Sequence, residues 1–219
     1  DFAHNPEPLP EHLTAICEEV RRTSADVGFV VDPDVDRLAI VDEHGAFFGE
    51  EYTLVSIADY LLGLNGGGNT VSNLSSTRAL RDVTLRHGGS YHAAAVGEVN
   101  VVTKMKEVNA LIGGEGNGGV IYPELHYGRD ALVGIALFLT MLAKSGRSVS
   151  ELRATYPSYY MSKQRVELSA DIDPQSLLDR LAREEQGKGE INLIDGVKID
   201  FSDRWVHVRR SNTEPIIRI

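Results

Sequence analysis

Asp32-Pro33-Asp34-Val35-Asp36-Arg37 is flanked by two apolar runs, one before it (residues 27–31) and one after it (residues 38–41). The runs are expected to form strands, which places the three carboxylates on a tight loop at a strand end. Carboxylates this close repel one another and raise one another's pKa unless a cation neutralises them. Oxygen ligands suit a hard divalent ion such as Mg2+, which also keeps positions for water and phosphate oxygens. Arg37 adds a planar donor that suits a phosphate.

Other interpretations of this loop are a solvated acidic turn, a calcium EF-hand and the DxD loop of an aspartyl-nucleophile phosphatase. The EF-hand has Glu43 at its twelfth position, but it needs Gly where Arg37 stands and helices where strands are expected. A phosphatase loop also follows an apolar strand and would use Asp32 as nucleophile. The loop alone does not exclude the phosphatase, so two distant segments decide.

Those segments are glycine-rich residues 113–119 (Gly-Gly-Glu-Gly-Asn-Gly-Gly) and residues 209–218 (Arg-Arg-Ser-Asn-Thr-Glu-Pro-Ile-Ile-Arg). With the acidic loop, their order and spacing resemble the α-D-phosphohexomutase superfamily, in particular its phosphoglucosamine mutase and phosphomannomutase/phosphoglucomutase branches. That family has four domains, and this chain resembles only the C-terminal half. The resemblance implies the end of domain 2 with the metal loop (1–49), a sugar-binding mixed α/β domain 3 (50–147), and a small phosphate-binding α+β domain 4 (148–219), incomplete at its C-terminal end.

The pattern of the chain agrees with that division. Strand and helix patterns alternate between residues 51 and 122, as in a mainly parallel α/β domain. A strand is expected at 110–112, before the glycine-rich loop, and an apolar helix at 129–144. Ser148 and Glu151 form a capping box. Beyond residue 158 the pattern becomes α+β, with expected elements at 159–168 (strand), 174–185 (helix), 191–201 (hairpin about Asp195-Gly196), 204–209 and 216–219 (strands).

Glu115 and Asn117 are the functional side chains of the glycine-rich segment. A carboxylate and an amide suit vicinal sugar hydroxyls, and the resemblance implies that role. The segment near the C-terminal end offers a guanidinium, hydroxyls, an amide and backbone N–H groups, which fit a phosphate dianion. Its expected phosphate ligands are Arg209, Ser211, Asn212 and Thr213, with Arg218 as a second clamp and Arg210 facing away.

The resemblance further implies an intramolecular phosphotransferase that interconverts hexose 1- and 6-phosphates through a phosphoserine enzyme and a bisphosphate. Mg2+ would be held by Asp32, Asp34 and Asp36, and Arg37 would contact the reacting phosphate. The phosphoserine loop is not in this chain, so this fragment alone is not expected to catalyse turnover.

Several positions depart from the family pattern. Pro33 and Val35 replace the glycines most often found between the aspartates. Asn117 and Gly119 stand where many relatives carry Ser and His, and that His is a candidate proton-transfer group. Ala95 stands where many carry a basic residue. His126, Arg129 and Asp130 could supply the missing function, although an ordinary helix start at Arg129-Asp130 is the favoured interpretation. The glycine-rich loop favours the phosphoglucosamine mutase branch. The alternatives are a phosphomannomutase/phosphoglucomutase and a non-catalytic sugar-phosphate binding protein on the same fold.

Composition limits the partners. A net charge of -10 argues against nonspecific nucleic-acid binding, which needs a basic face. No signal peptide is evident and no apolar run approaches the ~20 residues of a membrane span, so a cytoplasmic protein without membrane partners is expected. The expected partner is a hexose phosphate, and both a monomer and a homodimer are open.

Overall fold

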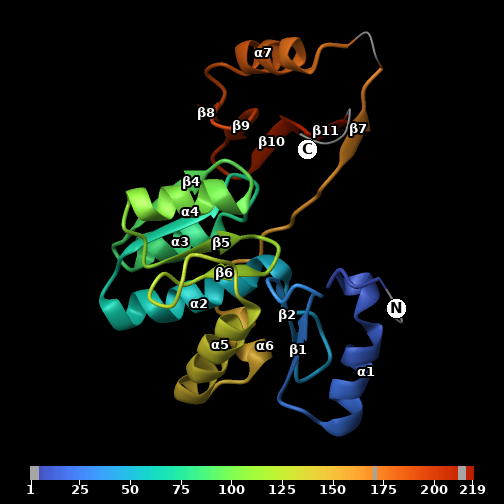
Figure 1. Cartoon of the computed structure of the whole chain (residues 1–219), viewed down its shortest axis with the longest axis vertical. Helices are drawn as coiled ribbons and strands as arrows, with labels where there is room; N and C mark the ends of the chain where they lie inside the picture. Colours follow the sequence, from blue (N-terminus) through green and yellow to red (C-terminus); the bar gives the residue numbers. More distant parts are fainter. Residues whose placement is uncertain (1–4, 170–171, 212–215) are drawn as a thin grey trace. The chain divides into compact units, whose positions relative to one another are not determined.

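The computed structural model describes residues 5–169, 172–211 and 216–219 (Figure 1). The chain divides into two compact units, Asp1–Tyr159 and Tyr160–Ile219. None of the described helices combines the length and the apolar character that a membrane crossing requires.

The first unit opens with a helix packed on a two-stranded hairpin, labelled in Figure 1. Its elements are η1 (Pro10–His12), α1 (Thr14–Thr23), β1 (Val27–Val31) and β2 (Leu38–Asp42). The strands are antiparallel and Val31 pairs with Leu38, so the acidic stretch is the loop that joins them. Gly28 allows the close approach of α1, because a Cβ there would lie 2.7 Å from Cγ2 of Val20. The expected strand–loop–strand is confirmed, and an EF-hand, which needs helices, is wrong.

A mixed four-stranded sheet follows, in the order β4-β3-β5-β6. Its elements are α2 (Glu50–Asn65), β3 (Asn69–Asn73), α3 (Ala79–Arg86), β4 (Ser90–Ala94), α4 (Glu98–Glu107), β5 (Ile112–Glu115) and β6 (Gly119–Ile121). β4, β3 and β5 are parallel, and β6 is antiparallel to β5. On one face, the Thr70 hydroxyl bonds that of Thr84 in α3 at 2.7 Å. On the other face, Val71 packs with Val101 and Met105 of α4. The mixed α/β fold expected from the sequence is confirmed.

The glycine-rich segment differs from the expected loop after Ile112. β5 continues to Glu115 and pairs with β6, which leaves residues 116–118 as the turn of a hairpin. Close packing explains the glycines: a Cβ on Gly113 would lie 2.5 Å from Sδ of Met105, and one on Gly114 would lie 2.0 Å from the carbonyl oxygen of Gly119. The glycines therefore permit a crowded strand pair.

The first unit ends with α5 (Ala131–Ser145) and α6 (Val149–Ala154). The capping box of Ser148 and Glu151 is present at the start of α6. Val149 and Leu152 are buried in the main core of this unit. Because α6 packs there, the division between the units falls after Tyr159, whereas the last domain was expected to begin at residue 148.

Tyr52 of α2 anchors the last residues of the first unit. Its hydroxyl donates to the carbonyl of Pro157 at 2.6 Å and accepts from the backbone N–H of Tyr159 at 2.9 Å. The guanidinium of Arg153 lies 3.4 Å from the centre of the Tyr52 ring. The segment up to Tyr159 is thereby held to α2 by two hydrogen bonds and a cation–π contact.

The second unit is the small α+β fold that was expected. Its described elements are β7 (Arg165–Glu167), α7 (Pro174–Glu184), β8 (Glu190–Asn192), β9 (Val197–Asp200), β10 (Trp205–Arg210) and β11 (Ile216–Arg218), and its strand order is β7-β11-β10-β9-β8. Leu178 of α7 packs with Val197 and Val208 in its core. The strand expected at 159–168 is shorter, because β7 pairs only alongside the short β11.

Candidate functional site

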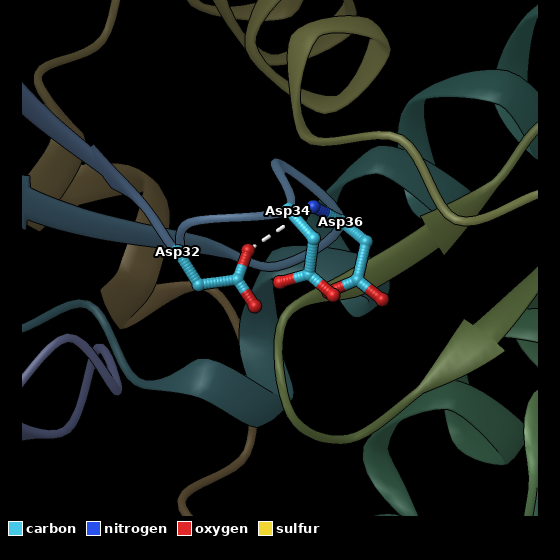
Figure 2. Close-up of side chains that lie close together, drawn as sticks. All are labelled: Asp32, Asp34 and Asp36. Atoms are coloured by element: carbon cyan, nitrogen blue, oxygen red, sulfur yellow. Dashed lines mark hydrogen bonds between the residues drawn. The ribbon is translucent and has the colours of Figure 1, made fainter.

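The three aspartates of the β1–β2 loop gather their carboxylates in one place. One oxygen from each of Asp32, Asp34 and Asp36 can be chosen so that all lie within 4.8 Å of one another. Figure 2 shows the carboxylates of Asp34 and Asp36 side by side, with that of Asp32 directed toward them. Asp32 is buried, Asp36 is half-buried and Asp34 is exposed. The group is therefore partly shielded and open on one side.

Backbone donors fix the shape of this loop. Oδ1 of Asp32 accepts the N–H groups of Asp36 at 3.1 Å and Arg37 at 3.0 Å, and the first of these bonds is dashed in Figure 2. Val35 has a φ of 59°, in the left-handed region, which costs an L-residue with a branched Cβ roughly 1–2 kcal/mol. The Val35 carbonyl accepts the N–H of Ala131 at 3.0 Å, so the start of α5 holds the loop in this shape.

The crowded carboxylates shift one another's protonation. Burial, with the charges of Asp32 and Asp34 adding to it, raises the pKa of Asp36 to about 6, although Arg129 opposes the shift. Burial also opposes ionisation of Asp32, but the backbone N–H of Arg37 and hydrogen bonds from Asp36 hold the pKa of Asp32 below its ordinary value. A cluster of this kind is stabilised by a bound cation.

The residues present fit a hard divalent cation. All three ligand groups are carboxylates, the donor type preferred by Mg2+. Oδ1 of Asp36 is buried and has no hydrogen-bond partner among the described residues, so it has lone pairs left for an ion. Nε of Arg37 lies 3.6 Å from Oδ2 of Asp32 and 3.8 Å from Oδ1 of Asp36. Arg37 therefore stays beside the cluster without occupying the ligand oxygens.

Glu115 lies at the carboxyl end of β5, where the parallel strands of the sheet end. Oε1 accepts Nδ2 of Asn73 at 2.8 Å and the N–H of Gly97 at 3.2 Å. Oε2 accepts Nη1 of Arg129 at 2.9 Å. Carboxyl ends of parallel strands are the usual ligand-binding edge of such sheets. Asn117 lies in the hairpin turn, where its Oδ1 accepts the N–H of Gly119 at 3.2 Å.

The acidic loop and the glycine-rich hairpin meet at that edge. The carbonyl of Gly118 accepts the N–H of Leu38 at 3.1 Å, and Arg37 forms an isolated antiparallel bridge with Gly119. Within the first unit the structure thus brings the aspartates, Arg37, Glu115 and Asn117 to neighbouring positions.

The sequence offered Arg129, with His126 and Asp130, as a source of the missing function but favoured an ordinary helix start. Asp130 caps α5 as expected, by accepting the N–H of Val133 at 3.0 Å, but the Arg129 side chain turns into the site. It forms ion pairs with Asp36, Glu115 and Glu98. The lack of basic residues at Gly119 and Ala95 was the only signal that another cation would be needed there.

The expected phosphate ligands of the second unit lie on β10 and β11. Arg209 and Arg218 are directly opposite each other in the antiparallel register, so their side chains share a face of the sheet. Ser211 follows β10 and its N–H donates to the carbonyl of Ile216 at 2.9 Å. Arg210 lines a cavity of about 290 Å3 beside α7, on the other face. Asn212 and Thr213 lie outside the described residues.

Family models match most of the chain. The model described as phosphoglucomutase/phosphomannomutase, alpha/beta/alpha domain II matches residues 1–45, and that of domain III matches residues 49–159. The fold and these matches place the chain in the α-D-phosphohexomutase superfamily, as the resemblance in sequence predicted. The chain belongs to the phosphoglucomutase/phosphomannomutase family.

Individual relatives agree with this assignment. A "Phosphoglucomutase/phosphomannomutase" of Thermococcus kodakarensis is 39% identical over 99% of this chain and 47% of its own length. A "Probable phosphoglucosamine mutase" of Methanopyrus kandleri is 35% identical over 98% of this chain and 47% of its own length. The crystal structure of a phosphoglucomutase/phosphomannomutase family protein of Burkholderia thailandensis superposes with a TM-score of 0.84 at 28% identity, covering 98% of this chain and 46% of that one. The chain spans about half the length of the curated relatives it matches.

Proposed function

We propose that this chain is the metal- and sugar-binding half of a phosphohexomutase that interconverts hexose 1-phosphate and 6-phosphate in the cytoplasm. The observation that carries the proposal is the meeting of the three-aspartate loop and the glycine-rich hairpin, through Leu38 and Gly118, at the ligand-binding edge of the sheet. Membership of the phosphoglucomutase/phosphomannomutase family supports phosphoryl transfer as the reaction at this site.

Each group has a defined task in the proposed reaction. Asp32, Asp34 and Asp36 hold Mg2+, which when bound neutralises charge on a transferring phosphoryl group. Arg37 lies beside these carboxylates and donates to the reacting phosphate. Glu115 accepts a sugar hydroxyl, which orients the ring for transfer.

The remaining contacts concern the second phosphate and the substrate. Arg209, Ser211 and Arg218, with Asn212 and Thr213, are proposed to hold the non-reacting phosphate of the bisphosphate intermediate, since paired guanidiniums and hydroxyls bind a dianion well. A phosphoserine outside this chain carries the phosphoryl group. Glucosamine phosphate is the proposed substrate, with mannose and glucose phosphates as alternatives. The glycine-rich loop, with Asn117 and Gly119 in place of Ser and His, and relatives with the name phosphoglucosamine mutase support that choice.

The test is an isomerase assay of the native full-length protein on glucosamine 6-phosphate, mannose 1-phosphate and glucose 1-phosphate, with Mg2+ and with EDTA. We expect Mg2+-dependent interconversion, abolished by Asp34→Asn and retained by Asp26→Asn, a control that removes a carboxylate outside the loop. Absence of isomerisation on all three substrates would refute the mutase and leave sugar-phosphate binding without turnover. Phosphate release that requires Asp32, without isomerisation, would instead indicate a phosphatase.

A further inference from the structure

We propose that Arg129 is a positioning residue that couples the metal loop to the sugar-reading hairpin by holding Asp36 and Glu115 through one guanidinium. The inference rests on the proposed function, because it assigns Arg129 a task at that same site. It goes further by predicting that a change at Glu115 alters cation binding at the aspartates.

The geometry of Arg129 supports this role. Nη2 pairs with Oδ2 of Asp36, Nη1 donates to Oε2 of Glu115 at 2.9 Å, and Nε donates to Oε2 of Glu98 at 3.2 Å. The backbone N–H of Arg129 also donates to Oε1 of Glu98 at 3.3 Å, and its side chain is only 14% exposed. Three carboxylates from three separate segments thus fix the plane of one guanidinium. Lys is a single flexible point charge and cannot reproduce that fork.

The contact with Asp36 leaves the ligand oxygen available. Arg129 occupies Oδ2 of Asp36, and it is the other oxygen, Oδ1, that is buried without a hydrogen-bond partner among the described residues. A partner that holds one carboxylate oxygen orients the other toward a metal. Loss of such outer contacts typically weakens metal binding about 10–100-fold.

The contact with Glu115 determines how that residue can bind a hydroxyl. A carboxylate has about four acceptor positions. In Glu115, Oε1 accepts Asn73 and Gly97, while Oε2 accepts Arg129. Among the described residues, further acceptor capacity therefore remains only on Oε2, the oxygen that Arg129 holds. Arg129 thus sets the direction in which Glu115 can accept a single hydroxyl.

The experiment measures Mn2+ affinity of this 219-residue chain by calorimetry for Arg129→Gln, Glu115→Gln and the double variant. Arg22→Gln and Glu19→Gln, from an exposed surface pair, are the matched controls. We expect about a tenfold loss for Arg129→Gln, a smaller loss for Glu115→Gln, and no further loss when Glu115→Gln is added to Arg129→Gln. That non-additivity separates coupling through Arg129 from the loss of a nearby charge.

Circular dichroism establishes that each variant is folded. If Arg129→Gln does not fold, Arg129→Lys replaces it in the same affinity measurements. Losses that simply add, or an affinity for Arg129→Gln equal to that of the controls, would overturn the proposal and leave the mutase function intact. Failure of the unsubstituted chain to bind Mn2+ would overturn the metal site itself, and the inference with it.

Discussion

Gly118→Ala is predicted to destabilise the first unit strongly, because Gly118 is where the hairpin touches β2. Its φ of +87° is unfavourable for any residue with a Cβ. A Cβ there would also lie 2.5 Å from the carbonyl oxygen and 3.0 Å from the nitrogen of Leu38. Both are backbone atoms, so no side chain can rotate away to make room.

The expected size follows from these two effects. The left-handed conformation costs an L-residue roughly 1–2 kcal/mol. The hairpin or β2 must in addition move by several tenths of an ångström, and overpacking of that kind costs typically 1–3 kcal/mol. The free energy of unfolding should therefore fall by about 2–5 kcal/mol, which for a chain of this size lowers Tm by very roughly 4–20 °C.

The assay is thermal and urea unfolding followed by circular dichroism, with Gly66→Ala as the matched control. Gly66 has a similar positive φ of +68°, but a Cβ there meets nothing within 4 Å, so only the backbone cost remains. Trp205, the sole tryptophan, lies in the second unit, and its fluorescence shows whether the effect is confined to the first. Equal destabilisation by the two substitutions would refute the contact with Leu38 as the cause.

Three further predictions concern stability and the cation. Burial opposes ionisation of Glu43, but hydrogen bonds from Ser148 and Ser150 lower its pKa to about 2. Ser150→Ala should therefore destabilise the protein above about pH 4.5 in thermal scans, and the difference should vanish as the pH falls toward 2; a constant difference would contradict this. Val35→Gly should raise the free energy of unfolding in urea by up to about 1 kcal/mol, because the relief of backbone strain exceeds the entropy cost of glycine. A loss of stability would show that the positive φ of Val35 does not strain the loop. Asp34→Asn should weaken Mn2+ binding at least tenfold without lowering Tm in EDTA, since Asp34 is exposed; unchanged Mn2+ affinity would exclude it as a ligand.

The sequence predicted features that depend on neighbouring residues. The apolar runs beside Asp32 and Arg37 fixed the hairpin, and local chemistry fixed the caps at Asp130 and Ser148. The site contacts of Arg129 escaped prediction because they join segments far apart: it lies 93 positions from Asp36 and 31 from Glu98 in the chain. The hydrophobic periodicity of a sequence contains no information about such long-range contacts.

The glycine-rich segment shows a second limit. Glycine disfavours strands, so residues 113–119 read as a loop, yet most of them are paired in β5 and β6. Tertiary crowding against Met105 and the opposite strand requires the glycines, and that crowding is invisible until the helix and the hairpin are folded together.

The anchoring of Pro157 and Tyr159 to Tyr52 indicates where the polypeptide can be divided for biochemical dissection. A chain that ends before Val149 would lack Val149 and Leu152, which are buried in the core of the first unit. A chain that ends immediately after Tyr159 keeps the contacts of Tyr52 with Arg153, Pro157 and Tyr159. A shortened recombinant product of that length should remain folded, and would let cation titration be followed without the arginine-bearing C-terminal module.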